Sequence, residues 1–585
     1  MIMLDSDDVL SGLDPEQRAV ACAPLGPVVV RAGAGTGKTR AITHRIAYLV
    51  HAGLVPAEQI MALTFTTRAA GELAIRLRAL GVPGVQARTF HSAALRQLNH
   101  FWPHEVGGAM PTVTPSKSAL VTAALRRLGV SANAATIGDI AGEIEWAKSM
   151  VMTPTQYAQK ADDRAAPLTQ VPFGQVFAAY ENEKLARGQI DFEDVLLLAT
   201  ALMEEDGSAA EEVQQRYRHY IVDEYQDVSP LQERLLSAWL GDSRSLTVVG
   251  DAAQTIYSFA GATSQFLDSF SRRFPTAQSF ELFRDYRSTS EVVAVANALL
   301  LAPQWQGAST AVRLEAQRGS GPLPRLLPSG PDGEAGDVAR RIQEQQQAGT
   351  ALSDIAVLFR TNAQSATIEE ALAQADIAYT VRGSERFFDR ADIKRAMTLI
   401  RGAARAGVAA ESSDAVLDDI VRALEAMGWS PSQEAAARSG ALGLAARESW
   451  EAVAALVSAA RDLVQTDPSM TVVGVYAALE KRANDHHGSA VEGVTLATLH
   501  AAKGLEWKCV HLIGLNEGLM PLVHARTQEH IDEERRLLYV GITRAQSDLL
   551  LSWDAQKPRS RFLSDIETAV ASSSAASPAT SPAAD

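Results

Sequence analysis

Residues 32–39 read AGAGTGKT, and this segment constrains the fold more than any other part of the chain. It follows the apolar run VVV at 28–30 and precedes a segment of helical apolar periodicity, which is the strand–loop–helix setting of a phosphate-binding P-loop. Glycines let such a loop close around a phosphate with its N–H groups pointing inward, and the helix dipole adds positive charge there. Lys38 would then reach the β- and γ-phosphates, and the Thr39 hydroxyl would bind Mg²⁺. The common pattern begins with Gly, where this chain has Ala32.

The composition predicts a soluble globular protein. With 585 residues, 46% of them hydrophobic and 21% charged, the chain is long enough for roughly two to four domains. It contains no run of ~18 uncharged apolar residues, so no membrane span is expected. The acidic stretch 1–8 lacks the basic region of a signal peptide. Cys22 and Cys509 are the only cysteines, which excludes a disulfide framework or a four-cysteine zinc site and favours a cytoplasmic location.

The net charge of −15 argues by itself against a nucleic-acid partner. This argument is weak for a motor, because a groove lined locally with Lys, Arg and stacking aromatic side chains is enough to hold a single strand.

The order of apolar runs predicts two α/β cores, each interrupted by a helical insertion. Asp14 is placed to cap a helix that begins at Pro15, and residues 68–80 have helical periodicity. The intervals 92–188 and 391–489 are mostly helix-like and too long to be loops within a compact sheet. Strand-like runs occur at residues 60–65, 220–224, 355–359, 494–497 and 510–513.

Polar side chains follow two further strand-like runs. Asp223 and Glu224 end the run at 220–224. In hydrolysis of a bound nucleotide, Asp223 would suit a ligand of Mg²⁺, and Glu224 would suit a general base that orients the attacking water. Gln254 follows the apolar residues 248–250 and could sense the γ-phosphate. Tyr257 and Phe259 come next, at a spacing that core residues also show.

Taken together, these motifs resemble those of the UvrD/Rep-type superfamily 1A DNA helicases. They occur in that family's order between residues 13 and 562, and segments 250–262 and 499–507 are similar to a second, actinobacterial UvrD-like branch. The matching residues are Gln17, AGAGTGKT (32–39), ALTFTTRAAGEL (62–73), RTFHS (88–92), DFEDVL (191–196), VDEYQDVSPLQ (222–232), VVGDAAQTIYSFAGA (248–262), LFRDYRS (282–288), VLFRTNAQS (357–365), VTLATLHAAKGLEW (494–507) and EERRLLYVGITRA (533–545).

The resemblance implies an α/β fold class with two RecA-like parallel-sheet motor cores, each carrying a mostly helical inserted subdomain. The expected parts are a first core at 1–91 and 189–280 with its insertion at 92–188, a second core at 281–390 and 490–568 with a shortened insertion at 391–489, and a disordered tail at 569–585.

The resemblance also implies a site for ATP and Mg²⁺ between the two cores. Gln17 would read the adenine edge, Tyr286 would stack on the base and Glu506 would hold the ribose. The implied catalytic residues are Lys38, Asp223, Glu224 and Gln254, with Arg287 and Arg544 as arginine fingers from the second core. The other nucleotide contacts are Gly33, Ala34, Gly35, Thr36, Gly37, Thr39 and Arg40, and the metal ligands are Thr39 and Asp223.

For DNA, the resemblance implies a track across both cores. Stacking on bases tolerates any sequence, which suits a motor that steps along a strand. The matching positions are Phe65, Thr66, Arg88, His91, Tyr257, Phe259, Thr498, His500 and Lys503. Phe192 and Phe562 lie in matching motifs and are as well explained as core residues.

Some features depart from the family's pattern. Ala252 and Ala253 replace a common polar pair, and Asp285 stands where Asn is usual. With two cysteines and few residues after Phe562, we expect neither the four-cysteine module nor the HRDC domain that follows the motor in the related branch. The absence of a nuclease-like motif argues against a subunit of a recombination helicase–nuclease.

We therefore expect an ATP-dependent 3′-to-5′ single-stranded DNA translocase and helicase that acts on single strands and tailed duplexes in DNA repair or replication, in the cytoplasm and associated with the nucleoid. Repair proteins could bind through the tail or the second insertion. The first alternative is a translocase that displaces proteins and unwinds poorly alone. A DNA-binding protein with a relic nucleotide site and a generic P-loop kinase or GTPase explain the motifs less well.

Overall fold

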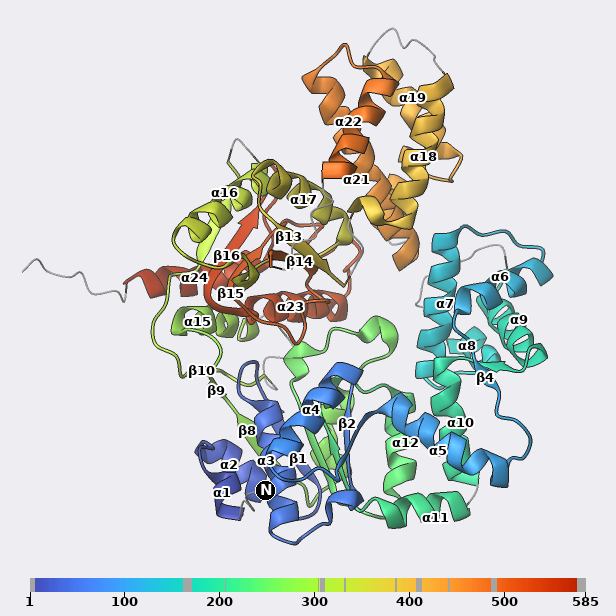
Figure 1. The fold of residues 1–585 in the computed structure, drawn as a ribbon, viewed down its shortest axis with the longest axis vertical. Helices are drawn as coiled ribbons and strands as arrows, with labels where there is room; N and C mark the ends of the chain where they lie inside the picture. The colour runs from blue at the N-terminus through green and yellow to red at the C-terminus, as the bar shows by residue number, and fades with distance from the viewer. Residues whose placement is uncertain are drawn as a thin grey trace, which may run out of the picture. The chain divides into compact units, whose positions relative to one another are not determined.

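The computed structural model describes residues 6–160, 171–205, 207–302, 305, 311–330, 333–383, 387–406, 413–439, 442–485 and 492–575. The chain forms two compact units (Figure 1). The first comprises Met1–Ala132, Ile140–Arg287 and Pro303–Arg318, and the second comprises Asn133–Asp139, Ser288–Ala302 and Gly319–Asp585. In the described ranges, no helix is both long and apolar enough to cross a membrane.

A six-stranded parallel sheet of order β3-β2-β6-β7-β1-β8 forms the centre of the first unit. Its strands are β1 (Val28–Ala32), β2 (Ile60–Thr64), β3 (Gln86–Thr89), β6 (His219–Val222), β7 (Leu246–Gly250) and β8 (Gln278–Leu282). The apolar runs at 28–30 and 60–65 are confirmed as strands. The run at 220–224 ends as a strand at Val222, so Asp223 follows the carboxyl end of β6.

Helices cover both faces of this sheet, so its four inner strands, β2, β6, β7 and β1, are largely buried on both sides. Val29 packs with α5, α10 and α12, whereas Val28 and Val30 pack with α2, α3 and α4. The helices of this core are α1 (Ser6–Leu10), α2 (Pro15–Cys22), α3 (Lys38–His51), α4 (Thr67–Ala79), α5 (Phe90–Glu105), α10 (Phe192–Glu205), α11 (Gly207–Arg216), α12 (Pro230–Leu240), α13 (Gln265–Asp268) and α14 (Phe270–Arg273).

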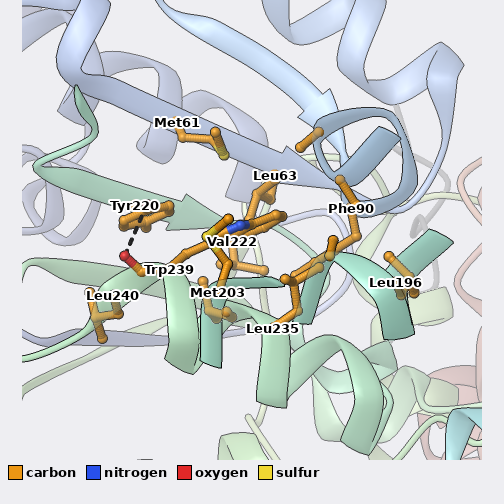
Figure 2. Packing of buried hydrophobic residues seen from close by; sticks show 14 of the residues in the cluster. Met61, Leu63, Phe90, Leu196, Met203, Tyr220, Val222, Leu235, Trp239 and Leu240 are labelled. Carbon is orange, nitrogen blue, oxygen red and sulfur yellow. Dashed lines mark hydrogen bonds between the residues drawn. The ribbon is translucent and has the colours of Figure 1, made fainter. Parts of the chain in front are cut away.

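An aromatic stack fixes α5 and α12 on one face of the sheet (Figure 2). Trp239 of α12 stacks on Phe90 and Tyr220 at ring-centroid distances of 6.1 and 6.4 Å, and its carbonyl accepts a hydrogen bond from the Tyr220 hydroxyl at 3.3 Å. Leu98 and Phe101 share this core. Most of α5 therefore packs with the sheet, although its residues from 92 onward were predicted to belong to the insertion.

The segment that follows α5 is mostly helical. Its elements are β4 (Thr112–Val113), α6 (Lys117–Arg127), α7 (Ala134–Ser149), α8 (Pro154–Lys160), α9 (Phe173–Ala186) and β5 (Gln189–Ile190), and β4 pairs with β5.

A buried cluster of ion pairs lies at the end of this segment, where the DFEDVL motif begins. The Lys148 ammonium lies 2.7 Å from Asp191 and 2.5 Å from Asp194, and that of Lys184 lies 2.5 Å from Asp194. The lysine charges hold the pKa of Asp191 well below its usual value, although burial opposes this. The acidic residues of the motif therefore serve the packing of α7, α9 and α10.

The second unit contains another six-stranded parallel sheet, of order β11-β16-β15-β12-β14-β13, which confirms the predicted α/β class with two parallel-sheet cores. Its strands are β11 (Arg325–Pro328), β12 (Ile355–Phe359), β13 (Tyr379–Arg382), β14 (Val494–Thr498), β15 (Trp507–Leu512) and β16 (Ala545–Trp553). The helices of this core are α15 (Ser290–Leu300), α16 (Gly333–Gln347), α17 (Ser365–Gln374), α23 (Gln528–Ile542) and α24 (Phe562–Ala575).

The second helical segment has a core of its own. It contains α18 (Ala391–Ala406), α19 (Ser413–Glu425), α20 (Glu434–Ser439), α21 (Leu444–Thr466) and α22 (Val472–Asp485). Trp429 and Trp450 stack within it at a centroid distance of 6.1 Å.

Two observed boundaries differ from the predicted ones. The first unit extends past residue 280 to Arg287, because β8 pairs with β1 and the short strand β9 (Arg284–Asp285) pairs with β10 (Glu315–Ala316) of the same unit. Helix α24 continues through residues 569–575, which were predicted to begin a disordered tail, because this alanine-rich stretch continues the helix begun at Phe562. The rest of that tail, 576–585, lies outside the described residues.

Candidate functional site

The loop between β1 and α3 has the backbone of a phosphate cradle. Gly35 and Gly37 have φ values of 71° and 77°, which side chains with a Cβ rarely adopt. A Cβ on Gly33 would lie 2.3 Å from the side chain of Leu314. The Thr36 hydroxyl donates to the Gly33 carbonyl at 2.9 Å and closes the loop. These contacts explain why the loop is built from small residues.

Lys38 opens α3 with a buried ammonium. Within the described part of the chain, its Nζ has no hydrogen-bond partner. Burial raises the pKa values of Asp223 and Asp251, and the nearby charge of Glu224 adds to this effect; the pKa of Asp223 is raised to about 7. The positive charge of Lys38 opposes the rise at both carboxyl groups. The structure therefore holds a buried cation close to carboxylates and leaves its hydrogen atoms for another acceptor.

The acidic residues lie where three neighbouring parallel strands end, because β1, β6 and β7 have their carboxyl ends at the same edge of the sheet. Asp223 Oδ1 accepts from the backbone N–H of Glu224 at 2.9 Å. Glu224 has a left-handed backbone, with φ 53°, which is costly for a residue other than glycine and is found mainly at functional sites.

Sequence reasoning missed Gln226, which orients these groups. Its Nε2 donates to Glu224 at 2.5 Å and its Oε1 accepts from the Asp251 N–H at 3.0 Å. Asp251 in turn accepts from Gln254 Nε2 at 2.7 Å. The only signal in the sequence was the position of Gln226 within the motif 222–232.

The oxygen donors present suit a magnesium ion. Asp223 offers a carboxylate whose raised pKa reflects burial next to another acid, and a divalent cation would relieve this cost. Thr39 lies on the first turn of α3 and offers a hydroxyl. Carboxylate and hydroxyl oxygens are hard ligands of the kind that Mg²⁺ prefers. The predicted pair Thr39 and Asp223 therefore fits the metal chemically.

The side of the loop predicted to face the base is built from two distant segments. Gln17 is buried, and its Nε2 donates to the Thr36 carbonyl at 3.1 Å. Tyr286 donates its backbone N–H to the Gly35 carbonyl at 3.0 Å, and its side chain is 45% exposed. Of the other predicted nucleotide residues, Ala34 is buried in the loop. Arg40 is exposed on the first turn of α3 and donates to the Gly12 carbonyl.

Arg287 was predicted on the second core, and the structure places it in the first unit. Its Cβ lies 3.0 Å from the position that a Cβ on Gly35 would take, and its N–H donates to Asp285 at 2.6 Å. Arg318 donates to its carbonyl at 2.7 Å. The β9–β10 pair holds this segment against the P-loop, a pairing that no local pattern in the sequence reveals.

Several of the predicted DNA-contacting residues of the first unit take part in aromatic ring pairs. Tyr257 and Phe259 meet edge to face at 6.0 Å, and Phe259 is 47% exposed. His91 meets Phe192 edge to face at 5.9 Å, and Phe192 is 56% exposed. Phe192 is thus an exposed aromatic side chain and not a core residue.

The other predicted DNA residues of this unit have structural contacts as well. Phe65 is partly buried against the core, Thr66 caps α4 by accepting from the Ala69 N–H, and Arg88 donates to Gln86 at 3.3 Å. Burial lowers the pKa of Arg88 and of His91.

In the second unit, the predicted residues gather at the end of β14 and the turn after it. Thr498 accepts from the Ala501 N–H at 3.3 Å. Burial, with the charges of Arg360 and Lys503, lowers the pKa of His500 to about 3. Glu506 accepts from Gln546 at 3.1 Å.

Arg544 and Phe562 are both buried in the second unit. The Arg544 guanidinium donates to the carbonyls of Val540 and Leu505 at 2.9 and 3.1 Å. Phe562 is fully buried under the Arg535 guanidinium, 4.9 Å from its ring centroid, so the core interpretation of Phe562 is confirmed.

A glycine loop with a buried lysine, set beside acidic side chains at the carboxyl edge of a parallel sheet, defines a P-loop nucleoside triphosphatase core. Comparison with known proteins specifies the family. Residues 13–275 match the UvrD/REP helicase N-terminal domain, and residues 280–410 and 417–556 match the UvrD-like helicase C-terminal domain. The chain belongs to the UvrD/REP family of ATP-dependent DNA helicases.

Individual relatives agree with this assignment. The chain is 48% identical to the ATP-dependent DNA helicase UvrD2 of Mycobacterium tuberculosis over 589 residues, 96% of this chain and 82% of that protein. It is 28% identical to the ATP-dependent DNA helicase PcrA of Bacillus subtilis, covering 96% of this chain and 86% of that one. It is also 28% identical to DNA helicase II of Escherichia coli, with coverage of 94% and 85%. The predicted resemblance to a second UvrD-like branch is confirmed.

Proposed function

We propose that the protein is an ATP- and Mg²⁺-dependent translocase that moves 3′ to 5′ on single-stranded DNA, unwinds tailed duplexes and acts in DNA repair or replication. The observation that carries the proposal is the ammonium of Lys38, buried in a glycine loop and without a hydrogen-bond partner among the described residues. Such a group is costly to leave unpaired, and the oxygens of a nucleotide triphosphate would satisfy it.

The residues around Lys38 suit the hydrolysis step. Thr39 and Asp223 would hold Mg²⁺, which neutralises charge on the β- and γ-phosphates when bound. Glu224, oriented by Gln226, is the group we assign to accept a proton from the attacking water. Gln254, bound to Asp251, would sense the γ-phosphate.

Two arginines complete the proposed site. Arg287 lies beside the P-loop, and Arg544 is assigned by family resemblance; both would stabilise charge that develops on the γ-phosphate. A guanidinium suits this role because its planar fork binds phosphate oxygens at two points.

The exposed aromatic pairs supply a surface for bases. Phe259 and Phe192 are 47% and 56% exposed, and stacking of bases on aromatic rings is independent of base identity. Tyr257 directly precedes η4 (Ser258–Ala260), a few residues after η3 (Ala252–Gln254). The proposed phosphate sensor and the proposed DNA contact therefore share one short segment, which supports coupling between hydrolysis and DNA binding.

Single-stranded and tailed duplex DNA in the nucleoid are the proposed substrates, and repair proteins bound through the tail or the second helical segment are the proposed partners. The test compares unwinding of 3′-tailed and 5′-tailed duplexes with ATP and Mg²⁺, with Lys38→Met as the inactive control. Unwinding of the 3′-tailed duplex alone supports the proposal, and unwinding that requires a 5′ tail contradicts the polarity. ATP hydrolysis and protein displacement without unwinding would favour the alternative translocase.

A further inference from the structure

The carboxylate of Asp14 joins two segments of the first unit that are 272 positions apart. Its Oδ1 accepts from the backbone N–H of Gln17 at 2.7 Å and caps α2. Its Oδ2 accepts from the hydroxyl of Tyr286 at 2.6 Å. One side chain thus contacts both residues assigned to the nucleotide base.

A second contact runs beside the first. The guanidinium of Arg284 donates to the carboxylate of Glu16 at 2.8 Å and 3.4 Å, and this hydrogen bond lowers the pKa of Glu16. This ion pair holds the segment around Glu16 against the segment around Arg284, next to the contact between Asp14 and Tyr286.

Both segments are also bound to the tip of the P-loop. Tyr286 donates its backbone N–H to the Gly35 carbonyl at 3.0 Å, and Gln17 donates to the Thr36 carbonyl at 3.1 Å. Tyr286 is therefore held at its backbone and at its hydroxyl, while 45% of its surface stays exposed. A ring fixed at both ends with an accessible face is a preorganised platform for stacking.

We propose that Asp14 is a positioning residue that fixes the Tyr286 ring as a stacking platform for the nucleotide base, in register with Gln17 and the P-loop. The inference rests on the proposed function, since it requires a nucleotide at this loop. Because the platform is fixed before binding, the base loses less entropy on stacking against it. Because stacking does not depend on base identity, the contribution should be equal for adenine and guanine nucleotides.

The experiment removes the Tyr286–Asp14 hydrogen bond and leaves the ring and the helix cap in place. Tyr286→Phe deletes the hydroxyl, and Asp14→Asn keeps an oxygen to cap α2 but loses the charged acceptor. Each variant, the double variant and wild type are titrated with ATP, GTP and inorganic tripolyphosphate in Mg²⁺ by calorimetry. Tyr476→Phe is the matched control, because its hydroxyl donates to Glu480 at 2.5 Å on α22 of the second unit.

Each single variant should bind ATP and GTP about three- to ten-fold more weakly, as expected for loss of a partly exposed hydrogen bond to a charged acceptor. The double variant should be no weaker than either single variant, because both remove the same bond. Binding of tripolyphosphate, which has no base, should not change. In steady-state hydrolysis, KM for ATP should rise while kcat falls much less.

Unchanged ATP affinity in Tyr286→Phe, additive losses in the double variant, or an equal loss of tripolyphosphate binding would each overturn the inference. The last result would mean that the bond supports the P-loop itself. The proposed function is tested separately, by ATP binding and hydrolysis of the wild-type protein. Lys38-dependent ATP hydrolysis by the wild type with normal affinity in Tyr286→Phe would refute only the role of Asp14, whereas a wild type that binds no ATP would refute both.

Discussion

Replacement of Lys38, whose ammonium is buried, should reduce the rate of ATP hydrolysis strongly and change the free energy of unfolding little. Lys38→Met keeps the volume and the aliphatic chain of the side chain and removes only the charged group. In hydrolysis, loss of one preorganised charged donor to the transferring phosphoryl group costs about 3–4 kcal/mol, or roughly 10²–10³-fold in rate. The full effect is expected because Nζ is buried and water cannot replace it.

The same change should have little effect on folding. Removal of a buried, unpaired polar group stabilises the native state by about 1–3 kcal/mol, whereas loss of its attraction to Asp223 and Asp251 acts in the opposite direction. The free energy of unfolding should therefore change by less than about 2 kcal/mol.

The assay combines steady-state ATPase rates with urea denaturation of the same preparations. Lys508→Met, at an exposed lysine on β15, is the control and should change neither quantity. A folded Lys38→Met protein with a normal ATPase rate would refute the site. A large loss of stability alongside the lost activity would show that Lys38 acts on folding and not on the nucleotide.

Three further predictions concern other residues. Arg544→Ala should lower kcat far more than the affinity for a non-hydrolysable ATP analogue, and Arg544→Lys should rescue it poorly; equal losses would exclude a finger role. Tyr257→Ala should weaken single-strand binding by about 1–3 kcal/mol while the salt dependence stays the same, and a reduced salt slope would contradict stacking. Burial lowers the pKa of His219 to about 3, so the unfolded chain binds this proton more tightly and stability should fall as pH drops below about 6.5, by about 2 kcal/mol at pH 5 relative to pH 7. Denaturation of His219→Gln should show a smaller loss over this range, and an identical loss would refute the assignment.

The sequence predicted the parts of the fold that depend on local pattern. Strand β12 is apolar throughout and β1 is apolar at residues 28–30, because both faces of their sheets are covered. Asp14 was identified as a helix cap from the Pro that follows it. Lys38 was predicted from a glycine-rich segment between an apolar run and a helical segment, and the structure places its buried ammonium at the start of α3, after β1 and the glycine loop.

These local patterns could not predict which strands pair when they are distant in the sequence. Residues 281–287 and 303–318 belong to the first unit because β8 pairs with β1 and β9 pairs with β10, and no change in composition marks these boundaries. The hydrogen bonds of Gln226 and the Asp14–Tyr286 contact depend on side-chain geometry, which periodicity does not encode. Phe192 and Phe562 have the same side chain, and only tertiary packing makes the first exposed and the second buried.

In the proposed mechanism, the segment 252–260 of the first unit connects nucleotide hydrolysis to single-stranded DNA. The most direct measurement is the steady-state ATPase rate of the full chain with and without oligo-dT, at saturating ATP and Mg²⁺. We expect a strong acceleration of ATP hydrolysis by oligo-dT that is lost in Lys38→Met and reduced in Tyr257→Ala. Equal rates with and without oligo-dT would contradict it.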